Sequence, residues 1–149
     1  MIEGVKTIPI VRHADDRGYV EEILRRDDPH FEKFGQVYLT TCRKGIIKAW
    51  HCHRYQTDRF FVVHGTAKIG LYDDRPESPT RGEYNTFVLG DDGQNVLLVI
   101  PPMVLHGQMA LSEMTHLLNV PTEPYNRKDP DELRRGIDEL VDIWTVQNR

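Results

Sequence analysis

Gly45-Ile46-Ile47-Lys48-Ala49-Trp50-His51-Cys52-His53 is the stretch of sequence that decides the fold of this chain. Residues two apart on a strand point to the same face of a sheet, so His51 and His53 are predicted to project together with Ala49. Two imidazoles on one face can bind a metal as neutral nitrogen donors, or exchange protons near neutral pH. The alternative is that one histidine is a satisfied core residue and the other faces solvent.

Short apolar runs separated by turn residues continue on both sides of this stretch. The runs predicted as strands are 19–24, 36–41, 46–53, 59–64, 67–72, 84–89, 95–100 and 114–120. Many short, evenly spaced strands indicate a β-sandwich or a small barrel. Near the C-terminus, Asp129 is expected to cap a short helix or turn over 130–136, with Pro130 at its first position and Gly136 as its stop.

Length and composition limit the class of protein. A chain of 149 residues with 39% hydrophobic and 28% charged residues predicts one globular domain spanning 1–149. The net charge of −4 argues against a nucleic-acid partner, which usually requires excess Lys and Arg. The N-terminal residues do not resemble a signal peptide, and the longest apolar run is far shorter than the roughly 20 residues of a membrane span. Cys42 and Cys52 form no paired pattern, which favours a cytoplasmic location.

A second histidine motif lies downstream, where Ile100-Pro101-Pro102-Met103-Val104-Leu105-His106 ends a predicted strand and presents a third histidine after a short turn. Together the two segments resemble the two sequence motifs of the cupin superfamily. The residues that match are Gly45, His51, His53, Asp58 and Gly65 in the first motif, and Pro101 and His106 in the second. The resemblance implies an all-β cupin domain, a jelly roll of the double-stranded β-helix type with a short C-terminal helical segment.

Three positions depart from the cupin pattern. Asp58 stands where glutamate is usual, Met103 where glycine is usual, and no asparagine follows His106. A shorter acidic side chain followed by Arg59 weakens a metal site, because a ligand must reach the ion and stay unpaired. We therefore expect no metal and no cofactor. The alternative is a metal-dependent cupin, such as a small dioxygenase or a sugar-phosphate isomerase, with the ligands His51, His53, Asp58 and His106.

A closer resemblance covers about 15–125. The segments that carry it include Asp16-Arg17-Gly18-Tyr19, Phe34-Gly35-Gln36, Asp74-Arg75 with Ser78-Pro79-Thr80, and His106-Gly107. In order along the chain these are similar to dTDP-4-dehydrorhamnose 3,5-epimerases. The resemblance implies proton abstraction next to the ketone of a nucleotide-linked 4-keto-6-deoxyhexose. That chemistry requires a base within hydrogen-bond reach of the carbon and a group that stabilises the enolate oxygen.

The resemblance also implies roles for particular residues. His51 matches the catalytic base, His106 the second active-site histidine, and Arg59 a lysine near the keto oxygen. The residues that match nucleotide-binding positions are Arg17, Gln36 and Lys48. Since a regular strand would point Lys48 away from His51, its role requires a bulge or an exposed edge. A homodimer is also expected from the resemblance, because cupin strands commonly pair across a two-fold axis.

The catalytic tyrosine of the epimerases is missing, since Leu118-Asn119-Val120 stands in its place. Asn119 and Tyr125 are therefore expected only to contact the substrate, with Tyr125 a possible proton donor if its loop folds inward. The acid that pairs with the base histidine is unassigned, with Asp138 and Asp142 as candidates.

His53 and Tyr38, by contrast, resemble features of the dTDP-sugar 3,4-ketoisomerases. The sequence leaves four functions open: an epimerase, a 3,4-ketoisomerase, a metal-dependent cupin, and a cupin that only binds a sugar nucleotide.

Overall fold

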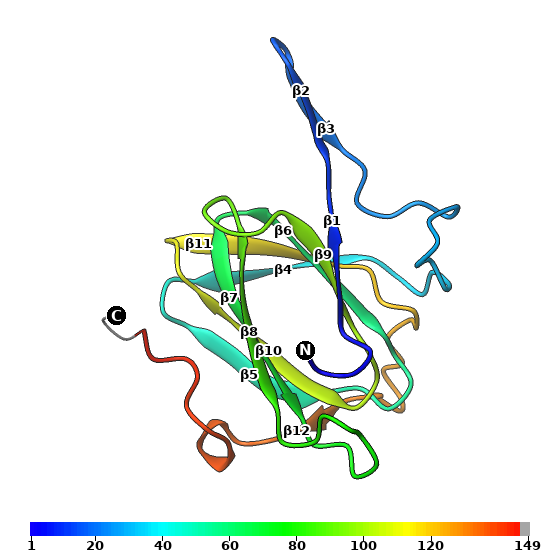
Figure 1. Cartoon of the computed structure of the whole chain (residues 1–149), viewed down its shortest axis with the longest axis vertical. Coiled ribbons are helices and arrows are strands. Elements are labelled where there is room, and N and C mark those ends of the chain that lie inside the picture. Colours follow the sequence, from blue (N-terminus) through cyan, green and yellow to red (C-terminus); the bar gives the residue numbers. More distant parts are fainter. Residues whose placement is uncertain (147–149) are drawn as a thin grey trace.

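The computed structural model of the chain describes residues 1–146, and its regular secondary structure consists of antiparallel strands apart from one 3-10 turn. One five-stranded sheet has the order β1 (Lys6–Pro9), β9 (Val96–Ile100), β6 (Asp58–His64), β11 (Met114–Asn119) and β4 (Tyr38–Arg43). The other has the order β12 (Leu133–Arg134), β5 (Ile47–Cys52), β10 (Val104–Ala110), β7 (Thr66–Asp73) and β8 (Tyr84–Gly90). The two sheets face each other (Figure 1), which confirms the all-β jelly-roll prediction.

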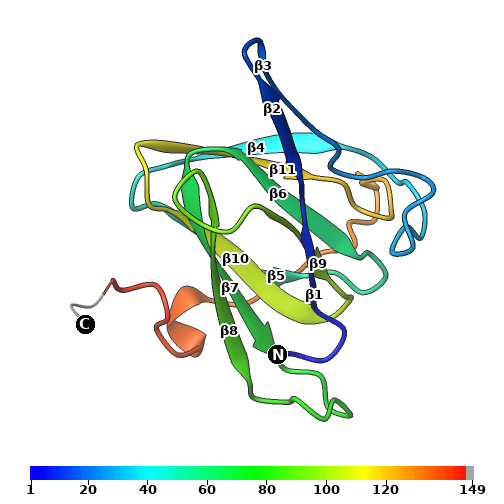
Figure 2. The same ribbon diagram turned by 45° about the horizontal axis from the view of Figure 1, so that its top comes forward.

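A hairpin of β2 (Arg12–Asp15) and β3 (Gly18–Glu21) projects away from the two sheets (Figures 1 and 2). Every residue of β2 is exposed, and Val20 on β3 is 64% exposed. The hairpin therefore contributes little to the core. No helix in the described part of the chain is long and apolar enough to span a membrane.

The core fills the space between the sheets because apolar side chains alternate along the strands. Phe60, Leu98 and Leu117 from the first sheet belong to the same buried cluster as Ile69 and Leu71 from the second. A second cluster lies on the opposite face of β5 and β10, where Leu105 alternates with the inward residues of its strand. There the ring of Trp50 contacts that of Trp144, with 5.0 Å between centroids. The C-terminal segment thus covers the outer face of the second sheet.

All eight predicted strands have a counterpart, but the structure has further strands. β1, β2 and β10 were not predicted as strands, and His106, expected after a short turn, follows that turn inside β10. The short helix or turn expected over 130–136 lies later in the chain: Leu133 and Arg134 pair with β5 as β12, and the 3-10 turn follows at Ile137–Glu139. The open edge of β5 supplies backbone partners to this segment, and pairing there replaces helix formation.

The turn before β10 has an unusual backbone. Met103 has a φ of 64°, in the left-handed region that favours glycine. This explains why the cupin pattern has glycine at this position, and it shows that the present chain keeps the turn geometry with a different residue.

Candidate active site

A bulge in β5 brings Lys48 to the same cavity as His51. His106 on β10 pairs with His51, whereas Gln108, two residues later, pairs with Lys48, so β5 has an extra residue at this point. A Cβ on Gly107 would lie 2.3 Å from the Cβ of Ala49, so only glycine fits opposite the bulge. The bulge that a role for Lys48 requires is therefore present, and Lys48 and His51 line the same cavity of about 390 Å³.

Three histidines meet at this end of the second sheet. The ring centroids of His51 and His106 are 4.2 Å apart, and those of His51 and His53 are 5.6 Å apart. One ring nitrogen from each lies within 4.8 Å of the others. His106 is almost fully buried, whereas His51 and His53 are partly open. The predicted grouping of the three is therefore present.

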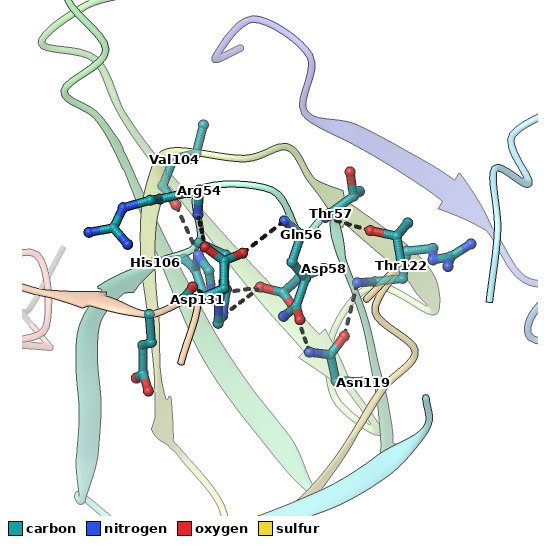
Figure 3. Close-up of polar contacts among 12 residues, drawn as sticks. Arg54, Gln56, Thr57, Asp58, Val104, His106, Asn119, Thr122 and Asp131 are labelled. Atoms are coloured by element: carbon teal, nitrogen blue, oxygen red, sulfur yellow. Dashed lines mark hydrogen bonds and ion pairs between the residues drawn. The ribbon is translucent and has the colours of Figure 1, made fainter. Parts of the chain in front are cut away.

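Asp58, at the start of β6, supplies the carboxylate of the site (Figure 3). Its Oδ1 accepts hydrogen bonds from Gln56 Nε2 and Asn119 Nδ2, each at 2.6 Å. Its Oδ2 lies 3.1 Å from His106 Nε2 and 3.5 Å from His53 Nε2. Burial by itself would raise the pKa of Asp58, but these donors lower it below its ordinary value, so the carboxylate is ionised.

The two C-terminal acids considered from the sequence lie elsewhere. Asp138 and Asp142 line a separate cavity of about 610 Å³ together with Trp144. Asp142 accepts hydrogen bonds from the backbone of Trp144 and from the hydroxyl of Thr145. The carboxylate of the histidine cluster therefore comes from β6.

His106 and His51 have different surroundings. His106 Nδ1 lies 2.9 Å from the carbonyl oxygen of Val104, and Nε2 faces the carboxylate of Asp58. A carbonyl oxygen only accepts hydrogen bonds, so Nδ1 of His106 carries a proton and donates it. Burial, together with the neighbouring His106, lowers the pKa of His51 well below its ordinary value. His51 is thus neutral at pH 7 and available as a base.

Tyr38 faces this base from the opposite sheet. Its hydroxyl oxygen accepts a hydrogen bond of 2.9 Å from Asn119 Nδ2, which leaves its own proton free to point elsewhere. Burial raises the pKa of Tyr38, so the phenol stays protonated. Asn119 is fully buried and also donates to Asp58, so it is a link between the tyrosine and the carboxylate.

A second cavity of about 330 Å³ adjoins the first, since both are lined by Tyr38, His51 and Glu132. Its remaining lining residues are Gln36, His53, Gln56 and Tyr125. The backbone N–H of Tyr125 donates to Gln36 Oε1 at 3.1 Å. The loop that carries Tyr125 thus folds inward, which is the condition for a role of Tyr125 in the site. Glu132 and Arg134 were not predicted as site residues, because their segment was expected to be helical.

Two predicted site residues lie away from the cavities. Arg59 follows Asp58 on β6 and points to the opposite face, where its side chain donates to the carbonyl oxygens of Val120 and Lys33. It lines neither cavity, so the expected place beside the keto oxygen is not occupied by Arg59. Arg17 lies at the turn of the β2–β3 hairpin, paired with Asp15.

The Asp74-Arg75 to Thr80 segment has a structural role. The buried Asp73 accepts hydrogen bonds from Arg75 Nη2, Ser78 Oγ and Thr80 Oγ1, at 2.5–2.8 Å. Arg75 and Thr80 also hold the backbone of Glu3. The segment therefore fastens the N-terminus to the loop between β7 and β8, and it lies outside the histidine site.

Comparisons with known proteins agree with this geometry. A sequence profile described as dTDP-4-dehydrorhamnose 3,5-epimerase matches residues 1–145. The spore coat polysaccharide biosynthesis protein SpsL of Bacillus subtilis is 40% identical over 135 residues, covering 90% of this chain and 89% of that protein. Among solved structures, a dTDP sugar isomerase from Desulfovibrio desulfuricans G20 is 30% identical with a TM-score of 0.86, covering 92% of this chain and 87% of its own.

A further solved structure binds a keto sugar. It is a variant of the 3,4-ketoisomerase QdtA from Thermoanaerobacterium thermosaccharolyticum in complex with TDP-4-keto-6-deoxyglucose. The identity is 26% and the TM-score 0.73, and the alignment covers 91% of this chain and 90% of that one.

Proposed function

The chain belongs to the dTDP-4-dehydrorhamnose 3,5-epimerase family, and from that premise we propose that it epimerises a dTDP-linked 4-keto-6-deoxyhexose with His51 as base and Tyr38 as acid. The family consists of enzymes, so the chain is a sugar-nucleotide epimerase or isomerase. One observation carries the finer proposal: a neutral histidine and a protonated tyrosine line the same two cavities from opposite sheets.

The reaction begins when His51 removes the proton from the carbon beside the ketone. The electrons of the C–H bond form a double bond between that carbon and the carbonyl carbon. The π electrons of the carbonyl group move onto its oxygen, which gives an enolate. His106, whose ring lies 4.2 Å from that of His51 between centroids, is proposed to offset this charge in its protonated form. Tyr38 then gives its proton to the same carbon from the other face. The tyrosinate takes a proton from solvent and His51 releases one, so both groups return to their starting states.

Positive side chains support a place for the diphosphate. Lys48 and Arg134 both line the cavity of about 390 Å³, and Arg134 lies opposite His51 in the β5–β12 pairing. Lys48 Nζ donates to the carbonyl oxygen of Thr41 at 2.6 Å, which holds the ammonium at the opening between the sheets. Gln36 and Tyr125, at the smaller cavity, are proposed to contact the remaining part of the substrate.

A 3,4-ketoisomerase is the second candidate, favoured by His53. Its ring lies 5.6 Å from that of His51 between centroids, edge to face. Moving a ketone from C4 to C3 needs a proton taken from one carbon and returned to its neighbour on one face, and two adjacent histidines suit that transfer. The likeness to QdtA supports the same candidate.

A metal-dependent activity is the third candidate. The nitrogens of His51, His53 and His106 are close enough to share an ion. Asp58 is a poor fourth ligand, because both of its oxygens already face donors. Metal analysis of protein purified without chelator tests this candidate, and a stoichiometric metal would support it.

Incubation with dTDP-4-keto-6-deoxyglucose in deuterated water, followed by NMR, tests the function. Deuterium at C5 with inversion supports epimerisation, and a carbonyl at C3 supports the ketoisomerase. dTDP binding without exchange at any carbon would indicate a cupin that only binds its ligand and would contradict both catalytic candidates. The His51→Asn variant should lose exchange, whereas the matched variant His64→Asn, at a histidine whose side chain is 70% exposed outside the site, should retain it.

A cytoplasmic homodimer fits the remaining features. The projecting hairpin carries exposed apolar residues, including Val11 at 63% and Val20 at 64% exposure, and a second copy is proposed to cover them. Arg17 at the hairpin turn would then bind nucleotide only in the partner's site. Both cysteines are free thiols, as is usual in the cytoplasm. Sedimentation of the wild type and of Val20→Asp tests the dimer, and a monomeric wild type would refute it.

A further inference from the structure

Asp131 closes the turn that follows the histidine strand. Its Oδ1 accepts the backbone N–H of Arg54 at 2.8 Å, and its Oδ2 accepts those of Tyr55 at 3.0 Å and Gln56 at 3.2 Å (Figure 3). Three consecutive amides converge on one carboxylate that comes from 75–77 residues further along the chain. Hydrogen bonds to an ionised acceptor are about twice as strong as neutral ones, so this contact fixes the turn firmly.

The main chain of Asp131 contacts the histidine itself. Its carbonyl oxygen lies 2.6 Å from Nδ1 of His53. A carbonyl only accepts hydrogen bonds, so Nδ1 carries the proton and donates it. The other nitrogen, Nε2, then points toward Asp58, at 3.5 Å from Oδ2. One contact therefore decides which nitrogen of His53 faces the cluster.

The segment after Asp131 has a fixed register on β5. Leu133 pairs with Cys52 and Arg134 with His51, and the backbones of Arg135 and Trp50 exchange two hydrogen bonds of 3.0 and 3.4 Å. Asp131 is thus anchored both by β12 and by its own carboxylate. Its carbonyl cannot move away from His53 unless one of these anchors is released.

We propose that Asp131 is a positioning residue of the active site, whose carboxylate holds its own carbonyl against His53 and so fixes the protonated nitrogen and the orientation of that ring. The contacts of Asp131 alone support the inferred orientation of the His53 ring. Its effect on turnover rests on the proposed function, because His53 takes part in proton transfer only if the site removes and returns protons.

Two variants and one matched control test the proposal. Asp131→Ala removes all three acceptor contacts, whereas Asp131→Asn keeps one oxygen and places an NH₂ group against at least one N–H donor. Asp129→Asn changes an exposed acid in the same segment and is the control. The measurements are the ¹⁵N shifts of the His53 ring, hydrogen exchange of the amides of residues 54–56, and the rate of deuterium incorporation into dTDP-4-keto-6-deoxyglucose.

The wild type and the control should show Nδ1 of His53 protonated and the three amides protected. Asp131→Ala should lose the preference for Nδ1, expose the amides, and lower kcat about 10–100-fold with KM nearly unchanged, since misplacing a proton-transfer group by about 1 Å has effects of that size. Asp131→Asn should lie between. If Asp131→Ala does not fold, Asp131→Asn alone carries the comparison.

The outcomes separate this proposal from the function it rests on. An unchanged His53 ring in a folded variant would overturn the positioning role, whatever the activity. A changed ring with unchanged kcat would overturn its catalytic consequence. A wild type that incorporates no deuterium would refute the proposed function, while the ring shifts would still decide whether Asp131 orients His53.

Discussion

Replacing Tyr38 by phenylalanine should separate proton removal from proton return. In the proposed reaction His51 alone makes the enolate, so Tyr38→Phe leaves that step intact. Without the phenol, the enolate regains a proton only from His51, on the face from which it left. The variant should therefore exchange deuterium at the original carbon while inversion slows about 10²–10⁴-fold, the usual contribution of a positioned general acid.

The effect on folding should be small and calculable. Tyr38→Phe removes one hydrogen bond, of 2.9 Å from Asn119 Nδ2, and Asn119 keeps its bond to Asp58. The free energy of unfolding should fall by about 0.5–1.5 kcal/mol, as for one lost hydrogen bond of this kind. Urea titration measures this change in the free energy of unfolding. If activity falls by more than the fraction of folded protein does, the excess reflects a slower chemical step.

NMR in deuterated water provides the assay, because exchange with retention and exchange with inversion give distinct sugar signals. Equal losses of exchange and inversion would refute the assignment of Tyr38 as the returning acid. Unchanged inversion would also refute it. Normal formation of a 3-keto product by Tyr38→Phe would favour the ketoisomerase, in which His51 and His53 act on one face.

Three further predictions follow from the contacts of Asp58, Lys48 and Asp73. Asp58→Asn should lower the free energy of unfolding by only about 1–3 kcal/mol in urea titrations, because the side-chain oxygen of asparagine can still accept from Gln56 and Asn119; a loss above about 5 kcal/mol would contradict this. Lys48→Ala should raise KM for the dTDP-sugar about tenfold and Lys48→Arg should lower it, since arginine binds phosphate through two donors; a change confined to kcat in steady-state kinetics would exclude phosphate binding. Asp73→Asn should lower the free energy of unfolding by about 2–4 kcal/mol at pH 7. Burial raises the pKa of Asp73, but donors led by Arg75 outweigh it and hold the pKa below its ordinary 3.8. The difference in stability from the wild type, measured by urea titration, should therefore shrink as the pH falls below that value. A gap that is constant between pH 7 and pH 3 would argue against an ionised Asp73.

The strands were predictable because alternation and turn residues are local properties. His51, His53 and His106 could be grouped from two short motifs, and the structure places their nitrogens within 4.8 Å of one another. β10 was missed because all seven of its residues are buried, so the strand shows no polar alternation. Arg59 could not be placed, since its direction depends on which face of β6 is turned to the site.

The C-terminal segment shows a different kind of limit. Asp129-Pro130-Asp131 has the composition of a helix start, and nothing local argues against it. The decisive partners are the free edge of β5 and the amides of residues 54–56, which lie far away in sequence. Local propensity was overridden by these contacts, and the same override hid Glu132 and Arg134 from prediction.

Asp58 explains why a cupin histidine cluster can act by acid–base chemistry instead of by metal binding. His106 Nδ1 is committed to the carbonyl of Val104, so Nε2 is its only nitrogen left for an ion. That nitrogen lies 3.1 Å from Asp58 Oδ2, so a metal ion there would have to displace this contact. The acid that looks like a shortened metal ligand in the sequence thus faces the remaining nitrogen of His106, while burial lowers the pKa of His51 and keeps it neutral as a base.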